Sequence, residues 1–180
     1  MEDTRNVLNE FKGWQHVNIV SELDKRGTGL EIAIENTERD FNMGTIVRSA
    51  NAFGVRYVHV IGRKQWNKRG AMATDKYLHV QYYSSVDEFS AAMQERQRTI
   101  IAIDNIEGSK SMATLRLPRN AVLVFGQEGP GISQDLIGRA DEVVAIEQFG
   151  STRSINVGVA AGIAMYVWLQ QHALAVEDSA

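Results

Sequence analysis

The feature that most constrains the fold of this chain is an alternation of short β-branched runs with longer stretches of helical periodicity. We predict strands over residues 30–35, 57–61, 79–83, 99–104, 121–125 and 142–146. We predict helices over residues 43–53, 71–77, 86–98 and 156–171, with another short helix after a turn at 126–131. Strands that alternate with helices imply parallel βαβ units and a sheet covered on both faces. The predicted fold class is therefore α/β with a parallel sheet.

A chain of 180 residues has the size of one domain, and its 44% hydrophobic content excludes a disordered protein. We expect a short extension over residues 1–28, the domain over 29–172 and a flexible tail over 173–180. The longest uncharged apolar run spans 157–169, shorter than the roughly 18 residues of a membrane-spanning helix. The polar, acidic first residues lack the pattern of a secretory signal, so we expect a cytoplasmic protein.

The residue inventory limits the chemistry of a site. There is no Cys, so disulfides, a thiolate nucleophile and Cys-ligated metals are excluded. The four His residues are scattered, and we expect no metal. The net charge is −3, yet residues 41–76 hold seven Lys and Arg side chains against one Asp, a local charge of +6. This segment is either a solvated face or a surface for phosphates.

Three segments carry candidate chemistry. In the first, helical periodicity places Asn42, Thr45, Arg48 and Ser49 on one face and apolar residues on the other. A polar face near the positive end of a helix suits an anionic ligand. The alternative is that Asn42 is an ordinary N-cap and Arg48 a surface charge.

The second segment follows the predicted strand 121–125. The loop contains Gly126, Gly129 and Gly131, which let backbone approach a ligand, and a carboxylate, Glu128. The alternative is a plain turn, with Glu128 in solvent or bonded to the amides of the next helix. The glycine spacing does not match a dinucleotide-binding loop, a phosphate-binding loop or a nucleophile elbow.

The third segment runs from a polar loop at residue 146 into the predicted helix 156–171. That helix is apolar all round and rich in Gly and Ala, so we predict that it is buried with other backbone packed against it, which excludes an exposed amphipathic role. Ser154 and Asn156 bracket its start, where a ligand would meet free N–H groups. Asn156 alone would also serve as a simple N-cap.

Taken in order, Asn42–Gly44–Arg48, the loop 125–132 and the run 154–161 resemble the SpoU (TrmH-like) branch of the SPOUT RNA methyltransferases. The resemblance covers about residues 31–168. It implies a deep C-terminal trefoil knot, an exception to the general rule against threaded loops. It also implies a homodimer, S-adenosylmethionine as cofactor, and methyl transfer to a ribose 2′-hydroxyl of RNA. The chain departs from the family at Gln127, where Asn or a small residue is expected.

The resemblance also assigns roles to residues. The cofactor would contact Gly126, Ile146, Ser154, Ile155 and Asn156, and the catalytic positions would be Asn42, Arg48, Glu128, Ser154 and Asn156. Arginine has a pKa above about 12 and is a poor base, so we expect Arg48 to fix an RNA phosphate and orient the hydroxyl. RNA phosphates would meet Arg48, Arg63, Lys64, Lys68 and Arg69.

Three alternatives remain open at this point. The compact size favours tRNA over rRNA as the substrate, but either fits the motifs. A knotted protein that binds RNA without catalysis would keep the basic segment, although the joint presence of the polar motif residues argues against it. A methyltransferase acting on a small molecule or a protein would not need the +6 segment.

Overall fold

The computed structural model describes residues 3–36 and 42–174. Within this part of the chain the strands form one all-parallel sheet of seven strands with the order β3-β2-β1-β6-β4-β7-β5. Their bounds are β1 Glu31–Asn36, β2 Tyr57–Gly62, β3 His79–Tyr83, β4 Thr99–Ile103, β5 Lys110–Ser111, β6 Ala121–Phe125 and β7 Glu142–Ala145. The predicted α/β class and parallel sheet are confirmed.

The central strands are buried on both sides, as their continuous apolar runs predict. Every residue of β1 and β6 is buried. Side chains alternate between the two faces, so Ile32 and Ile34 join one core cluster while Ala33 joins the other. Each face therefore needs its own cover of helices.

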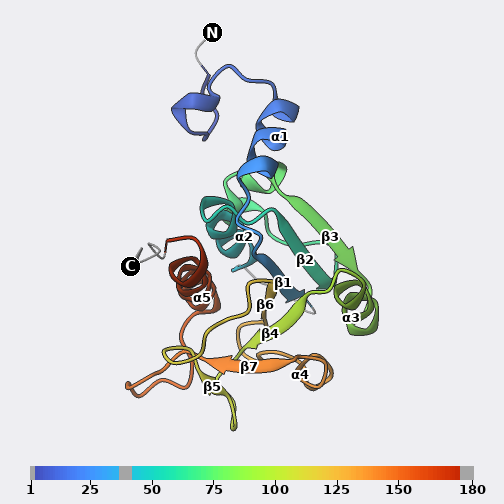
Figure 1. Ribbon diagram of the computed structural model, residues 1–180, viewed down its shortest axis with the longest axis vertical. Helices are drawn as coiled ribbons and strands as arrows, with labels where there is room; N and C mark the ends of the chain where they lie inside the picture. Colours follow the sequence, from blue (N-terminus) through green and yellow to red (C-terminus); the bar gives the residue numbers. More distant parts are fainter. Residues whose placement is uncertain (1–2, 37–41, 175–180) are drawn as a thin grey trace, which may run out of the picture.

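Helices cover the two faces unequally (Figure 1). The longer pair, α2 (Met43–Ala52) and α5 (Val157–His172), packs on the face of the larger cluster. The pair α3 (Val86–Glu95) and α4 (Gln134–Ile137) packs on the opposite face. Ser85 caps α3 by accepting from the Glu88 amide, and Ser133 caps α4 by accepting from the Leu136 amide.

The connections after β4 determine where a ligand can bind. From β4 the chain passes through β5 and returns to insert β6 between β1 and β4, then leaves to form β7 on the far side of β4. The carboxyl ends of β4, β6 and β7 are thereby gathered at one edge, which is where ligands bind in open parallel sheets.

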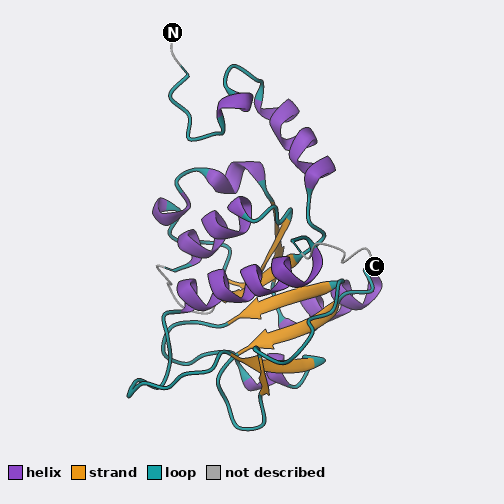
Figure 2. Ribbon diagram, turned by 60° about the vertical axis from the view of Figure 1, so that its left-hand side comes forward, coloured by secondary structure: helices purple, strands orange, loops and turns teal. Residues whose placement is uncertain are grey.

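The structure differs from the sequence prediction in the first third of the chain. Within residues 1–28, which were expected to form a short extension, the structure has a helix that was not predicted, α1 (His16–Arg26), whose Ile19 is buried. It lies beyond the sheet, near the N-terminal end in Figure 2. Asp24 fastens it to the domain by accepting hydrogen bonds from Arg56 Nε at 2.8 Å and His79 Nε2 at 2.9 Å.

Smaller differences concern element type and length. The single helix predicted at 71–77 is instead two 3-10 turns, η2 (Arg69–Ala71) and η3 (Thr74–Tyr77). They are separated by Met72 and Ala73 in the left-handed region, which breaks the helix. Helix α3 ends at Glu95 rather than near 98, and the two-residue strand β5 and the 3-10 turn η1 (Asn9–Phe11) were not predicted.

Helix α5 corrects one prediction. Its Gly/Ala-rich side is buried as expected, with Ala161, Ala164 and Trp168 in the core. The opposite side is also apolar but is open in this chain: Val159 is 55% exposed, Ile163 38% and Tyr166 46%. The prediction that this helix is buried was therefore wrong for this side. Across the described residues, no helix combines the length and apolar character needed to cross a bilayer.

Candidate functional site

A cavity of about 330 Å³ lies at the carboxyl ends of β4, β6 and β7. Its walls are the three loops that follow these strands, together with the first turns of α5. The loops contribute both polar and apolar side chains, with Asp104, Glu128 and Arg153 among the charged ones. A cleft of this size suits a small organic molecule rather than a macromolecule.

Four of the five predicted cofactor residues line this cavity. They are Gly126, Ile146, Ser154 and Ile155. Asn156 does not line it, although the residues on either side of it, Ile155 and Val157, do. The structure thus brings the second and third motifs together around one space, as the resemblance implies.

The loop after β6 is folded so tightly that its first residue must be glycine. A Cβ on Gly126 would lie 2.2 Å from the carbonyl carbon of Gly131. The two ends of the loop pair directly, because the Gln127 and Gly131 amides each donate to the other residue's carbonyl oxygen at 3.1 Å. The loop therefore presents a fixed backbone edge to the cavity.

A chain of side-chain hydrogen bonds joins the three motifs. Asn42 Nδ2 donates to Glu128 Oε2 at 2.9 Å, and Asn156 Nδ2 donates to Asn42 Oδ1 at 2.9 Å. Asn156 Oδ1 in turn accepts from the Gly158 and Val159 amides at 2.9 and 3.2 Å. All of these bonds run in one direction from the first turn of α5 to the carboxylate, which determines how both amides are oriented.

These hydrogen bonds decide between the alternatives that the sequence left open for Asn42, Glu128 and Asn156. Asn42 precedes α2, but its side chain makes no capping hydrogen bond and is used for the motif contacts instead. Glu128 binds Asn42 rather than the amides of α4, which is capped by Ser133. Asn156 does act as an N-cap, for α5, and binds Asn42 at the same time.

Arg48 makes none of the hydrogen bonds that join Glu128, Asn42 and Asn156. It is exposed on α2 and does not line the 330 Å³ cavity. It lines a second cavity of about 380 Å³, between α2, η3 and the N-terminal segment, together with Asn51, Thr74 and Tyr77. Six residues separate Arg48 from Asn42, a rise of roughly 9 Å along a helix. The structure therefore places the predicted catalytic arginine apart from the other motif residues.

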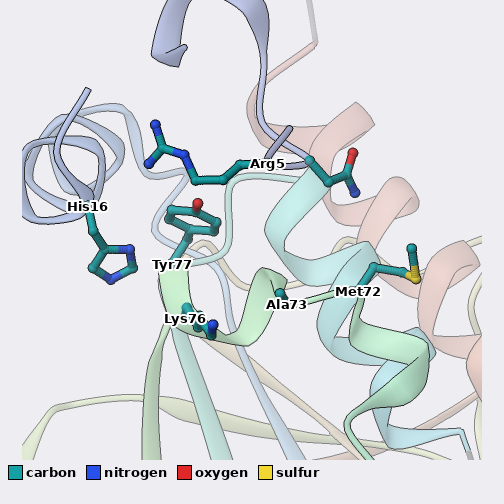
Figure 3. Close-up of a pocket in the computed structure, with 7 residues that line it drawn as sticks. Arg5, His16, Met72, Ala73, Lys76 and Tyr77 are labelled. Atoms are coloured by element: carbon teal, nitrogen blue, oxygen red, sulfur yellow. The ribbon is translucent and has the colours of Figure 1, made fainter. Parts of the chain in front are cut away.

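A third cavity, of about 540 Å³, adjoins the second through Tyr77. Figure 3 shows Arg5 and His16, from the N-terminal part of the chain, on either side of the Tyr77 ring, with Lys76 and Met72 nearby. The His16 and Tyr77 rings lie 5.0 Å apart, centroid to centroid. Aromatic rings and cations in one hollow suit a base with its phosphate.

The basic segment is largely free of salt bridges with the residues that the structure describes. Arg48, Arg63, Lys64, Arg69 and Lys76 form none there. Two of its cations are already used: Arg56 binds Asp24, and Lys68 Nζ lies 2.8 Å from Asp75 Oδ2. The hydrogen bond that Lys68 donates to Asp75 raises the pKa of Lys68. Of the predicted RNA contacts, Lys68 is therefore the least available.

Sequence reasoning missed one cavity residue with evident chemical capacity. Asp104 lies directly after β4 and lines the 330 Å³ cavity. The prediction had ended a strand at this residue and assigned it no role. The available signal was its position, since a carboxylate just beyond a parallel strand lies at the binding edge of the sheet.

Fold and site together define a class of protein: a parallel α/β domain with a loop-built cavity at its strand ends and three sequence motifs joined beside it. The chain belongs to the SpoU rRNA Methylase family, whose profile matches residues 29–166. It is 24% identical over 155 residues to the tRNA (guanosine(18)-2′-O)-methyltransferase of Escherichia coli K12, covering 84% of this chain and 68% of that protein. The enzyme of the same description from Aquifex aeolicus is 28% identical over 148 residues, covering 80% of this chain and 70% of that protein.

Solved structures resemble the whole domain. The A. aeolicus TrmH/SpoU tRNA modifying enzyme superposes with a TM-score of 0.76 at 26% identity, covering 87% of this chain and 81% of that one. The SpoU methyltransferase AviRb from Streptomyces viridochromogenes, solved in complex with AdoMet, gives a TM-score of 0.73 at 22% identity. That match covers 84% of this chain and 63% of AviRb. At that identity the likeness to AviRb concerns the fold alone.

Proposed function

We propose that this protein transfers a methyl group from S-adenosylmethionine to a ribose 2′-hydroxyl of RNA, and that its substrate is a tRNA rather than an rRNA. The observation that carries the proposal is the hydrogen-bonded chain of Glu128, Asn42 and Asn156 beside the cavity. These hydrogen bonds join three motifs: Asn42 and Glu128 are 86 residues apart in sequence, and Asn42 and Asn156 are 114 apart. The names of the E. coli and A. aeolicus relatives support tRNA as the substrate.

The cavity fits the proposed cofactor in its chemistry. Ile146 and Ile155 provide apolar walls for a purine ring, and the backbone of the 126–131 loop provides donors and acceptors for its edge. Asp104, Glu128 and Arg153 provide charged groups for a zwitterionic amino-acid tail and a sugar. When bound, the cofactor supplies a methyl group on a sulfonium, which is already electrophilic.

The chain's own residues would then orient the acceptor. The cofactor held by the residues that line the cavity would supply the methyl group, and the proton of the 2′-hydroxyl would pass to water or an RNA phosphate. Arg48 stays protonated, so its role is to hold a phosphate and align the hydroxyl. Asn42, fixed by Glu128 and Asn156, holds the start of α2 and thereby the helix that carries Arg48.

The proposed RNA surface is the basic segment together with the cavities beneath the N-terminal segment. Its cations Arg63, Lys64 and Arg69 are exposed and form no salt bridge with described residues, so binding RNA would not require breaking one. Arg48 lines the second cavity together with Asn51 and Ala52 from the second half of α2 and with residues of the N-terminal segment. Residues 29–172 would form the methyltransferase domain, with residues 1–28 contributing to RNA capture.

We also propose that two copies pair through the open face of α5. Val159, Ile163 and Tyr166 form an apolar stripe, and the Tyr166 ring lies 6.2 Å from that of Phe53, the residue that directly follows α2. Contiguous exposed apolar residues on a helix mark an interaction surface. Ile163→Asp should convert a dimer to a monomer in sedimentation experiments, while Gln94→Asp, at an exposed polar position of α3 on the opposite side of the sheet, should not. The C-terminal knot remains a prediction from the family resemblance.

One experiment tests the reaction directly. Purified protein is incubated with radiolabelled S-adenosylmethionine and, separately, unmodified tRNA or rRNA, and the RNA is digested to nucleosides. We expect label in a 2′-O-methylnucleoside from tRNA. Label from rRNA alone would overturn the substrate class. Cofactor binding without transfer would point to a missing partner or another substrate, and RNA binding without cofactor binding would favour a non-catalytic RNA-binding protein.

A further inference from the structure

Asp104 stands at a junction of two of the three loops that build the cofactor cavity. It follows β4 directly, and its side chain reaches across to the end of the glycine loop after β6. Its Oδ2 accepts a hydrogen bond from the Ile132 amide at 3.0 Å, and its Oδ1 accepts one from the Asn105 amide at 2.8 Å. The carboxylate therefore has a fixed position and orientation.

The glycine loop is shaped around this carboxylate. A Cβ on Gly131 would lie 2.7 Å from Asp104 Oδ2, and Gly131 also has a positive φ of 74°. Only glycine fits both conditions without strain. Asp104 is half-buried and lines the cavity.

The electrostatics of Asp104 point to a ligand. Its two protein partners are neutral backbone amides, and it forms no salt bridge with any residue in the described ranges 3–36 and 42–174. A carboxylate can accept about four hydrogen bonds, and these amides use one site on each oxygen. A half-buried carboxylate with acceptor capacity directed into a cavity favours a ligand that carries hydrogen-bond donors.

We propose that Asp104 binds the ribose hydroxyls of the cofactor, accepting hydrogen bonds from the 2′- and 3′-OH. This inference rests on the proposed function, because it assumes that S-adenosylmethionine occupies the cavity. A carboxylate at the carboxyl end of a parallel strand is well placed to bind a ribose diol. The apolar walls formed by Ile146 and Ile155 suit the attached purine. A cationic group of the methionine tail is the competing partner, and the experiment below separates the two.

The test pairs a change in the protein with a change in the ligand. The ligands are S-adenosylhomocysteine and its 2′-deoxy and 3′-deoxy analogues, and their dissociation constants are measured by calorimetry for wild type and Asp104→Asn. For wild type we expect each missing hydroxyl to weaken binding about 10-fold or more, as for a hydrogen bond to a charged group. Asp104→Asn should bind the parent ligand about 10- to 100-fold more weakly and lose little further affinity when a hydroxyl is removed.

The substitution and the missing hydroxyl should not act independently on affinity, and a merely structural role of Asp104 would not give that result. If Asp104→Asn only loosened the loop at Ile132, it would weaken all three ligands by the same factor. A fourth ligand, 5′-methylthioadenosine, keeps the ribose but lacks the amino-acid tail. We expect the variant to lose affinity for it as well, because the diol is still present. Unchanged affinity for methylthioadenosine would assign Asp104 to the tail and overturn the proposal.

A matched control is available three residues away. Glu107 is an exposed carboxylate on the same loop and does not line the cavity. Glu107→Gln should leave all four dissociation constants unchanged. If wild type binds the deoxy analogues as tightly as the parent, the ribose inference fails while the proposed function stands. If wild type binds none of the adenosyl ligands, both fail.

Discussion

Two polar clusters lie at opposite ends of the same sheet, and they differ in how their hydrogen bonds are completed. At the amino ends of the strands, Glu31 is 1% exposed and is surrounded by His59, Arg96 and Arg98. At the carboxyl ends, Glu128 and Asn156 are exposed, and Asn42 between them is half-buried beside a cavity. The first cluster is closed within the chain, whereas the second leaves polar groups where a ligand can reach them.

The amino-end cluster satisfies its buried carboxylate completely. Glu31 Oε2 lies 2.8 Å from His59 Nε2, and Arg96 and Arg98 each donate to Glu31 Oε1 at 2.5 Å. Burial alone raises the pKa of Glu31, but the hydrogen bonds from His59 and the arginines outweigh it, so its pKa lies below the usual value. A charge this well compensated has a structural role.

The comparison shows that perturbed electrostatics alone does not locate function. The group with the more complete set of ionic partners, Glu31, belongs to the framework, while the neutral amides Asn42 and Asn156 link the motifs. Openness to a ligand, rather than burial, distinguishes the carboxyl end. Substitutions at the two ends should therefore separate stability from activity.

The largest effect is expected at Arg48. Arg48→Ala should lower kcat for methyl transfer about 10²–10³-fold, because a positively charged group that orients the acceptor is lost from the transition state. Its exposed position on α2 predicts an unchanged melting temperature. Single-turnover transfer to tRNA measures the rate, and cofactor affinity should stay constant. Arg119→Ala, at an exposed arginine outside all the cavities described, should retain full activity. Equal losses in both variants would refute a specific role.

Glu31→Gln should have the opposite effect to Arg48→Ala: it should lower stability and leave kcat almost unchanged. Removing the charge leaves Arg96, Arg98 and His59 around a neutral amide, and we expect a loss of about 3 kcal/mol in the free energy of unfolding. Urea denaturation measures it, and at a temperature where the variant is folded its kcat should be close to that of wild type. Destabilisation of less than about 0.5 kcal/mol would show that the ionic cluster contributes little.

The pH dependence of this cluster follows from the same carboxylate. Because the folded-state pKa of Glu31 is lowered, its stabilisation is fully present above the pKa of the unfolded carboxyl and is lost as pH falls through the folded value. The relevant window lies below about pH 4.5. Between pH 6 and 3, wild type should lose stability more steeply than Glu31→Gln. Parallel curves would exclude Glu31 as the titrating group.

Most of the fold could be predicted from the sequence, because its signals are local. The fully buried β1 and β6 read as continuous apolar runs, and α2 as an amphipathic helix. Helix α1 was missed because its single buried residue, Ile19, gives a weak pattern, although the Glu22–Arg26 pair at i,i+4 spacing was a visible hint.

For the site, the sequence indicated most of the residues that line the cavity but not the contacts among the motif side chains. Gly126, Ile146, Ser154 and Ile155 converge on one cavity as the motifs implied. The hydrogen bonds among Glu128, Asn42 and Asn156 could not be read from the sequence, since they depend on how distant loops meet in space. The separation of Arg48 from that group has the same origin: helical periodicity gives a residue's face but not which cavity that face meets.

At the carboxyl end, two substitutions of Asn156 should separate helix capping from the link between motifs. Asn156→Ala removes the acceptor for the Gly158 and Val159 amides and should cost about 1 kcal/mol of stability as well as activity. Asn156→Asp keeps the cap but cannot donate to Asn42. We expect wild-type stability for Asp with transfer reduced about 10-fold, the loss of one hydrogen bond. Thermal melts and transfer rates of the two variants distinguish helix capping from the hydrogen bond to Asn42. Full activity of Asn156→Asp would show that this hydrogen bond has no part in the mechanism.

The smallest effect is expected on the basic surface, where two adjacent cations differ in their partners. Arg69 is exposed without a salt bridge to any described residue, whereas Lys68 is held by Asp75 at 2.8 Å and lies 5.4 Å from the centre of the Trp66 ring. If both face RNA, Arg69→Ala should lower the magnitude of the slope of log affinity against log salt by about 1, and Lys68→Ala by less. Filter binding of tRNA from 50 to about 200 mM salt measures both. Equal slopes for Arg69→Ala and wild type would place the RNA elsewhere, and an equal change in both variants would mean that Lys68 exchanges Asp75 for a phosphate on binding.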